Sequence, residues 1–316
     1  MGGYESIFRP GLFDGRTILI TGGGTGLGRC TAHELASLGA RVVICGRREA
    51  VLSETAEEIR SDGGQCDFET MDVREDEAVT AAVARIVERV GPIHGLFNNA
   101  GGQFAAPAEK ISSSAFKKVV DLNLNGTFQV TRAVFEASMK AHGGSVVNML
   151  ADIRSGYVGM VHSAAARAGI ENMSITLALE WSRYDIRMNC VAPGTILSSG
   201  MRTYPPPIQQ SGVDGARVVP ASRLGTESEV AAVVTFLLSP ASAFVTGQTI
   251  AIDGGSSFQK RTLFETTKHA PTSRFDGFHR PEDWSGTPFA VFFDEEEGDG
   301  ARPPDGRVEE RGGRGA

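Results

Sequence analysis

Several residue types and patterns are scarce in this 316-residue chain. It has only four cysteines, Cys30, Cys45, Cys66 and Cys190, and none forms a C-x-x-C pair. This spacing argues against a zinc site or a disulfide framework and suits a reducing cytoplasm. No apolar run approaches the ~20 residues of a membrane-spanning helix, and no run of signal-peptide type follows Met1. We therefore expect a soluble cytoplasmic protein without a membrane partner or a bound metal.

The chain also has no excess of positive charge. Its formal net charge is −7, with 31 Lys and Arg against 38 Asp and Glu. Nucleic acids and anionic membrane surfaces bind proteins through clustered positive charge, so neither is an expected partner. The hydrophobic share of 41% is high enough for a folded core and excludes a mostly disordered chain.

Composition divides the chain into an N-terminal arm (1–13), a domain (14–258), a C-terminal arm (259–297) and a tail (298–316). The tail consists mostly of Gly, Pro, Arg, Asp and Glu. It has too little apolar surface to offset the entropy of ordering, so we expect it to be disordered. The C-terminal arm has aromatic side chains that can dock it on the domain: Phe275, Phe278, Trp284, Phe289, Phe292 and Phe293.

Residues 14–258 alternate short apolar runs with helical patterns, which is typical of repeated βαβ units. The expected strands are 17–20, 42–45, 95–97, 145–149, 188–191 and 249–252. Apolar residues three and four apart indicate helices in 27–38, 75–90, 116–142 and 163–181. Because the strands are apolar on both faces, helices should cover both faces of the sheet. The sequence predicts an α/β fold: a single doubly wound Rossmann domain with a central parallel sheet.

A glycine-rich segment of pattern G-x-x-x-G-x-G follows the first expected strand and opens a helix. Glycines permit a tight turn and close approach of a ligand to the backbone, and a helix N-terminus presents free N–H groups to a pyrophosphate. The strand-turn-helix context therefore predicts a dinucleotide site. The residues expected to form it are Thr21, Gly22, Gly24, Thr25, Gly26, Leu27 and Gly28.

The end of the second expected strand, Cys45-Gly46-Arg47-Arg48, indicates which dinucleotide binds. An acidic side chain here would hold the ribose 2′-hydroxyl of NAD, and this strand end has none. Gly46 leaves room, and Arg47 can form a bidentate contact with a 2′-phosphate. The alternative is that Arg47 and Arg48 are solvated loop charges. The first interpretation predicts NADP, as NADPH, for the cofactor.

Further motifs give the chain a resemblance to a known family. Asn98-Asn99-Ala100-Gly101, Asn123 in Asn-Leu-Asn-Gly-Thr-Phe, Pro193-Gly194 and Asp253-Gly254-Gly255 follow the glycine loop in order. Together they resemble the short-chain dehydrogenase/reductases, over about residues 14–258. Five motifs in the right order are highly specific for that family.

The resemblance implies roles for several residues. Asp72 would contact the adenine, Asn99 would steady the sheet beside the cofactor, and Asn123 would hold a catalytic helix and a water chain. The remaining cofactor positions that it implies are Val73, Ala100, Gly101, Arg167, Pro193 and Gly194. The usual assembly in the family is a homotetramer, with a homodimer as the other expected state.

The chain departs from the family at the chemistry. The family's carbonyl reductases use Ser and then Tyr-x-x-x-Lys. None of the four tyrosines here is followed by lysine four places on, and no lysine occurs between Lys140 and Lys260. Aligning the fifth strand and the next helix puts Ala151 at the serine position, Ser163 at the tyrosine and Arg167 at the lysine.

These substitutions lie within strings that resemble a narrower branch. Residues 149–152 (Met-Leu-Ala-Asp) and 162–169 (His-Ser-Ala-Ala-Ala-Arg-Ala-Gly) are similar to peroxisomal trans-2-enoyl-CoA reductases and to bacterial dehydrogenases of citronellol and citronellal breakdown. Gly101-Gly102-Gln103-Phe104 and Ala178-Leu179-Glu180-Trp181 are features shared with the former group.

Reduction of a C=C bond conjugated to a thioester tolerates these substitutions better than reduction of a carbonyl. Hydride added to the β-carbon leaves a delocalised enolate, whose oxygen needs hydrogen-bond donors, while water can protonate the α-carbon later. Ser163 can donate to that oxygen, and Arg167 lies at i+4 on the same helix face, where it can orient the nicotinamide ribose. A localised alkoxide instead requires a matched acid, and serine is a poor one.

Two neighbouring polar residues remain open to two interpretations. Asp152 follows the fifth strand at its C-terminal end, where it can either pair with Arg167 or act as an acid. His162 adjoins Ser163, but consecutive helical residues diverge by about 100°, which favours a structural role over proton donation.

The loops around this helix supply three further side chains. Tyr157 and Met160 are more typical of a pocket wall than of chemistry. Tyr204 and the three prolines after it stand where the family has its mobile substrate lid, and prolines would stiffen that lid.

The sequence thus predicts an NADPH-dependent oxidoreductase that reduces the C=C bond of an α,β-unsaturated acyl thioester, such as an enoyl-CoA. Its catalytic candidates are Ser163, Arg167, Asn123 and Asp152. A second interpretation is a terpenoid alcohol or aldehyde dehydrogenase, which would not need a CoA group. A third is an NADP-binding protein whose redox activity is lost or repurposed. The missing tyrosine and lysine favour this third interpretation, and the retained cofactor site opposes it.

Overall fold

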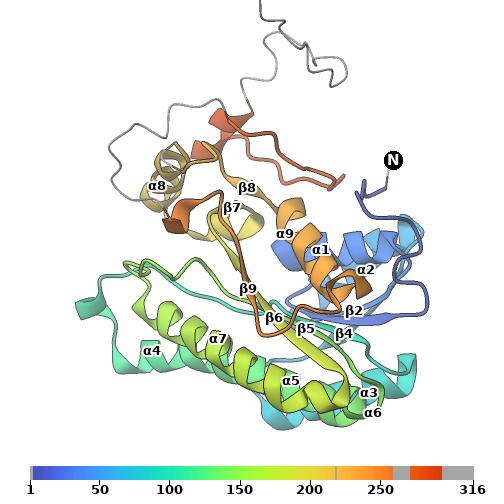
Figure 1. The fold of residues 1–316 in the computed structure, drawn as a ribbon. Helices are drawn as coiled ribbons and strands as arrows, with labels where there is room; N and C mark the ends of the chain where they lie inside the picture. The colour runs from blue at the N-terminus through green and yellow to red at the C-terminus, as the bar shows by residue number, and fades with distance from the viewer. Residues whose placement is uncertain (1–2, 218, 259–270, 294–316) are drawn as a thin grey trace, which may run out of the picture.

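Seven parallel strands form a central sheet in the order β3-β2-β1-β4-β5-β6-β9 (Figure 1). The computed structural model describes residues 3–217, 219–258 and 271–293. The strands are β1 (Thr17–Thr21), β2 (Arg41–Gly46), β3 (Gln65–Thr70), β4 (Gly95–Asn98), β5 (Gly144–Met149), β6 (Ile186–Pro193) and β9 (Thr249–Ile252). The order reverses between β1 and β4, which is the switch point where ligands bind in doubly wound sheets. The predicted fold class is confirmed.

Helices cover both faces of this sheet, as the apolar strands require (Figure 1). One face packs against α1 (Gly26–Ser37), α2 (Glu49–Ser61) and α9 (Glu227–Leu238). The other packs against α3 (Asp76–Val90), α5 (Gly126–Val134) and α7 (Val161–Trp181). The strands β1, β4 and β5 lie in the middle of the sheet. Their C-terminal ends therefore lie between the two layers of helices.

The helix expected over 116–142 is a continuous run of helical turns from Ser113 to His142. It comprises α4 (Ser113–Val120), α5 and α6 (Lys140–His142), joined by wider π-type turns at Asp121–Asn125 and Phe135–Met139. Pattern analysis missed β3, because this edge strand is only partly buried and carries polar residues. No helix among the described residues is long and apolar enough to cross a bilayer.

A small pair of strands and one helix stand over the C-terminal ends of the sheet. They are β7 (Ile196–Leu197), β8 (Gly225–Thr226) and α8 (Pro206–Ala216). Residues 271–293 of the C-terminal arm lie against this region and against α1. Phe278 packs with Tyr4, while Trp284 and Phe289 pack with residues of α8. The disorder expected in 298–316 concerns residues outside the described ranges.

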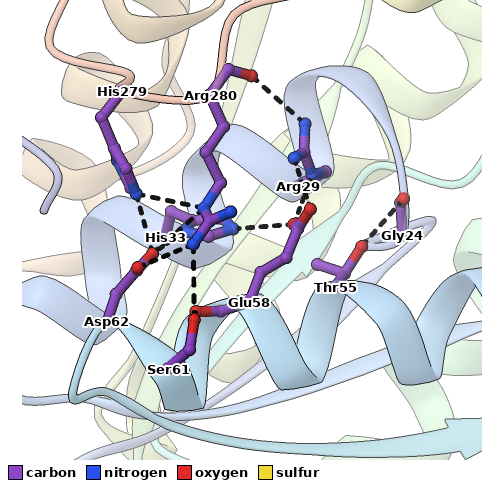
Figure 2. Close-up of polar contacts among 9 residues, drawn as sticks. All are labelled: Gly24, Arg29, His33, Thr55, Glu58, Ser61, Asp62, His279 and Arg280. Carbon is purple, nitrogen blue, oxygen red and sulfur yellow. Dashed lines mark hydrogen bonds and ion pairs between the residues drawn. The ribbon is translucent and has the colours of Figure 1, made fainter. Parts of the chain in front are cut away.

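Ion pairs fasten the arm to α1 and α2 (Figure 2). The Asp62 carboxylate accepts hydrogen bonds from Arg280 Nη2 and His279 Nε2, each at 2.8 Å. Beside them, both oxygens of Glu58 accept from the guanidinium of Arg29 at 2.8 Å. The ring of His33 is 3% exposed and lies between the two carboxylates. The arm is therefore held by charge as well as by aromatic packing.

The buried position of His33 gives a pH-dependent stability. Burial, helped by Arg29, lowers the pKa of His33 from 6.5 to about 4. The unfolded chain therefore binds a proton at this residue between about pH 6.5 and 4 while the folded protein does not, so this contribution to stability is lost as pH falls through that window. Each pH unit inside the window lowers the free energy of unfolding by up to ~1.4 kcal/mol.

We expect His33→Gln to remove this slope. The free energy of unfolding of both proteins is measured by denaturant titration from pH 7 to pH 4.5. The difference in this free energy between wild type and variant should change by about 2–3 kcal/mol over that range. The raised pKa values of Glu34 and Glu227, each about 7, act in both proteins and cancel in the difference. The exposed His142, changed to Gln, is the control. A difference that is flat with pH would contradict the assignment.

Candidate active site

A cavity of about 900 Å³ opens at the C-terminal ends of the central strands, between the two helical layers. The glycine-rich loop lies along one part of it, and Tyr157, Arg167 and Tyr204 line another. Most of the residues expected to bind the cofactor line this cavity: Gly22, Gly24, Thr25, Gly26, Leu27, Arg47, Asp72, Val73, Asn99, Ala100, Gly101, Arg167, Pro193 and Gly194. Thr21 and Gly28 are buried and do not line it.

The glycine loop leaves its backbone free for a ligand. Thr25 is the N-cap of α1, and no side chain caps this helix end. Gly26 has a φ of +56°, which non-glycine residues rarely adopt. A Cβ on Gly28 would lie 2.4 Å from the carbonyl oxygen of Gly22, so α1 can approach the loop only because position 28 has no side chain. The unpaired N–H groups at the start of α1 form a cradle that suits a pyrophosphate.

Thr21 and Asn99 join the glycine loop to the loop after β4. The hydroxyl of Thr21 accepts hydrogen bonds from the backbone N–H groups of Asn99 and Ala100, at 3.1 and 3.0 Å. The amide of Asn99 donates back to the carbonyl oxygens of Thr21 and Gly22, each at 3.1 Å. Both loops are thus fixed to each other before any ligand binds.

The part of the cavity beside the end of β2 carries charged groups. Arg47 and Arg48 are both exposed and both line the cavity. Asp72 accepts hydrogen bonds from Arg74. These bonds, together with a smaller effect of the Arg47 charge, hold the pKa of the Asp72 carboxyl below its usual range. A cationic side chain therefore stands at the end of β2, where an NAD-specific site has an acidic one.

Ser163 does not face the cavity. Its side chain is fully buried, and its hydroxyl donates to Gln103 Oε1 at 2.6 Å while it accepts from Arg167 Nε at 3.3 Å. Direct donation from Ser163 to a substrate oxyanion is thus not supported, because the only hydroxyl hydrogen is used on Gln103. Arg167 itself is half-buried and lines the cavity, and its Nη1 donates to the carbonyl oxygens of Met149 and Leu150 at 2.9 Å.

Gln103 connects Ser163 to two tyrosines on the cavity wall. Its Nε2 donates to the hydroxyl oxygens of Tyr157 and Tyr204, both at 2.9 Å. The sequence predicts no role for Gln103, and the two tyrosines were expected to belong to the pocket wall and the lid. The shared string at 101–104 was the one signal for Gln103, and nothing local could show that residues 54 and 101 positions away meet it.

The side chain of Asn123 bonds to backbone groups and does not line the cavity. It is 2% exposed and lies in the π-type turn between α4 and α5. Its Nδ2 donates to the carbonyl oxygens of Gly102 and Val119, both at 2.8 Å, and its Oδ1 accepts from the N–H of Gly102 at 3.3 Å. These bonds fix the loop that carries Gln103, so Asn123 positions this loop, while the roles expected of it, holding a catalytic helix and a water chain, stay predictions.

Asp152 lies on the cavity wall without pairing with Arg167. Its Oδ2 accepts from the hydroxyl of Ser256 at 3.0 Å, and its buried Oδ1 has no hydrogen-bond partner among the described residues. No hydrogen bond or ion pair joins it to Arg167 in that part of the chain, since the guanidinium is held by backbone carbonyls and Ser163. The ion-pair interpretation is wrong, and the role as an acid or water ligand stays a prediction.

His162 is fully buried beside Ser163. Its Nδ1 accepts from the backbone N–H of Ser163 at 2.8 Å, and its ring packs edge-on against Phe104 with centroids 4.4 Å apart. Because Nδ1 is an acceptor, the neutral ring carries its hydrogen on Nε2. It does not line the cavity, which agrees with a structural role.

Comparison with known proteins places these features in a family. A protein-family model described as "Enoyl-(Acyl carrier protein) reductase" matches residues 22–257. A probable 2,4-dienoyl-CoA reductase of Bacillus subtilis is 38% identical over 76% of this chain and 96% of its own length. The peroxisomal 2,4-dienoyl-CoA reductase of Rattus norvegicus is also 38% identical, over 80% of this chain and 87% of its own.

A solved structure is more similar in sequence. The citronellol catabolism dehydrogenase of Pseudomonas aeruginosa PAO1 is 52% identical, over 80% of this chain and the whole of that one, with a TM-score of 0.73. The resemblance to citronellol dehydrogenases thus has a counterpart among the relatives, and in place of the expected trans-2-enoyl-CoA reductases the relatives above are named for 2,4-dienoyl-CoA reduction.

Proposed function

Since this chain belongs to the short-chain dehydrogenase/reductase family, we propose that it is an NADPH-dependent reductase of the C=C bond of an α,β-unsaturated acyl thioester. It is an oxidoreductase that uses a nicotinamide cofactor. The observation that carries the choice of substrate is the missing acid: Ser163 and Arg167 stand where carbonyl reductases have tyrosine and lysine. The relatives named for 2,4-dienoyl-CoA reduction support the same chemistry.

The cavity fits NADPH. The uncapped N-terminus of α1 and the glycine loop would hold the pyrophosphate, and Arg47 would hold the 2′-phosphate. Asp72 and Val73 would border the adenine, and Arg167 the nicotinamide ribose. When bound, the nicotinamide supplies the hydride that adds to the β-carbon of the substrate.

The residues of this chain would then stabilise and protonate the negatively charged intermediate left on the substrate. The electron pair of the C=C bond moves toward the carbonyl, so the thioester oxygen becomes an enolate oxygen that needs donors. Arg167 places positive charge beside this part of the cavity. Asp152 lines the cavity and would position a water molecule that delivers the proton to the α-carbon.

A second candidate is oxidation of a terpenoid alcohol or reduction of its aldehyde, favoured by the 52% identity to a citronellol catabolism dehydrogenase. The discriminating experiment follows NADPH consumption by the purified protein with trans-2-hexenoyl-CoA and with citronellal, and NADH serves as the cofactor control. Turnover of the thioester with NADPH supports the proposal. Turnover of citronellal alone would favour the second candidate, and cofactor binding without any turnover would favour a non-redox role.

Arg47 gives a separate test of the cofactor. We expect Arg47→Ala to raise KM for NADPH about 10- to 100-fold, because the charged bidentate contact with the 2′-phosphate is lost. KM for NADH should change little. Arg48→Ala is the matched control, as its side chain is also exposed on the cavity wall. If Arg47→Ala keeps its preference for NADPH and Arg48→Ala loses it, the 2′-phosphate contact would be assigned to Arg48 and not to Arg47.

The remaining proposals concern assembly and compartment. Phe128 on α5 and Ile175 and Leu179 on α7 are exposed apolar side chains that suit a subunit interface, so the protein should run as a homotetramer or homodimer in light scattering. The four cysteines are free and buried, which suits the reducing cytoplasm.

A further inference from the structure

Two tyrosine hydroxyls on the cavity wall point to an oxyanion hole that does not use the family's usual tyrosine position. We propose that Tyr157 and Tyr204, both held by Gln103, together bind the thioester oxygen of the substrate and stabilise it as an enolate. This inference rests on the proposed function. It names the donors that Ser163 and Asn123, turned away from the cavity, do not supply.

The hydrogen bonds of this cluster run in one direction, starting at Arg167. The guanidinium can only donate, so Ser163 Oγ accepts from it, and the serine hydroxyl donates its own hydrogen to Gln103 Oε1 at 2.6 Å. The Gln103 amide is thereby oriented with Nε2 toward the tyrosines, and its two N–H hydrogens go one to each phenol oxygen. Both phenols are acceptors in this network.

Each tyrosine therefore keeps its own O–H hydrogen for another partner. Neither hydroxyl has a second hydrogen bond to any of the described residues, and both side chains line the cavity. The two phenols bond to the two hydrogens of one planar amide nitrogen, a geometry that separates their oxygens by about 5 Å. A single oxygen atom can accept from both at about 3.0 Å, the long end of the range for O–H···O bonds.

The electrostatics of the cluster suit donation to an anion. Partial burial raises the pKa of Tyr204, so the phenol stays protonated at neutral pH. The charge of Arg167 acts on both phenols. Its electrostatic interaction with the substrate would become more favourable as negative charge develops on the thioester oxygen. Hydride addition at the β-carbon shifts the C=C electron pair to the thioester oxygen, and water later supplies the proton at the α-carbon, so the phenols lose no proton.

Separate elements bring the two donors together. Tyr157 lies in the loop between β5 and α7, while Tyr204 lies just before α8, where Gln209 Nε2 donates to its carbonyl oxygen at 2.8 Å. The arm residues Trp284 and Phe289 pack behind α8. The hole is thus complete only when the segment that carries α8 lies over the cavity.

The test uses Tyr157→Phe, Tyr204→Phe and the double variant, which keep the aromatic rings. With NADPH and trans-2-hexenoyl-CoA we expect kcat to fall by about 10²-fold for each single variant and further for the double variant, since each removes one donor to the transition state. The Kd for NADPH, measured by fluorescence, should stay at the wild-type value. A double variant that keeps the wild-type kcat would overturn the hole.

Gln103→Glu tests the positioning residue. A carboxylate can only accept, so it would draw the phenol hydrogens toward itself and away from the cavity. We expect a loss of kcat as large as that of the double variant, with both tyrosines still present. The exposed Gln248, changed to Glu, is the control and should have no effect. Wild-type kcat in Gln103→Glu would contradict the proposed geometry.

A non-reacting ligand separates failure of the hole from failure of the proposed function. Hexanoyl-CoA offers the same thioester oxygen without a C=C bond, and calorimetry with NADP present should show at least 10-fold weaker binding to the double variant. If the wild type does not reduce enoyl thioesters, the proposed function fails, and this binding comparison still decides on the hole. Equal binding to wild type and double variant, or none to either, would overturn it.

Discussion

Arg167→Met is expected to lower kcat for the enoyl thioester by about 10²- to 10³-fold. The guanidinium holds two backbone carbonyls at 2.9 Å and donates to Ser163, which in turn orients Gln103. Without it, the serine hydroxyl is free to rotate and the amide of Gln103 loses its fixed direction. The positive charge next to the developing enolate is lost as well.

Arg167→Lys is the informative companion to this variant. Lysine keeps the charge but cannot donate from one planar group to two carbonyls and a hydroxyl, so we expect a kcat between those of wild type and Arg167→Met. Single-turnover kinetics at saturating NADPH would isolate the chemical step. Equal activity of Arg167→Met and wild type would show that the buried relay is dispensable.

Gly28→Ala should abolish most cofactor binding. The added Cβ would lie 2.4 Å from Gly22 O and 2.6 Å from Asn99 Nδ2, both of which belong to the fixed junction of the two loops. To relieve this contact, α1 has to move away from the glycine loop, and the pyrophosphate cradle opens. We expect the Kd for NADPH to rise at least 100-fold, which is about 2.7 kcal/mol, together with a lower unfolding midpoint.

Gly215→Ala is the matched control for this substitution. Nothing lies within 4 Å of a Cβ at Gly215, which is in α8, so alanine there should be neutral or slightly stabilising. Fluorescence titration of NADPH would compare the two variants with wild type. Wild-type affinity in Gly28→Ala would mean that the loop adapts and does not depend on close packing of α1.

The sequence by itself predicted the features that depend on local order. The glycine loop, the strand before it and the helix after it are contiguous, and Arg47 follows the next strand directly, so their placement on one wall follows from the βαβ unit. The contact between Arg167 and Ser163 likewise follows from i,i+4 spacing on α7. Edge strand β3 was missed because it is half polar, and helices α2, α8 and α9 were not among the helices expected from the sequence.

The direction in which the candidate catalytic side chains face was decided only by the tertiary structure. Ser163 was expected to face the substrate and bonds to Gln103 instead, while Asn123 bonds to the backbone of Gly102. Gln103, the partner of Ser163, meets residues 54, 60 and 101 positions away in the sequence. A hydrogen bond between distant loops depends on how the helices and strands pack, and local periodicity carries no information about it.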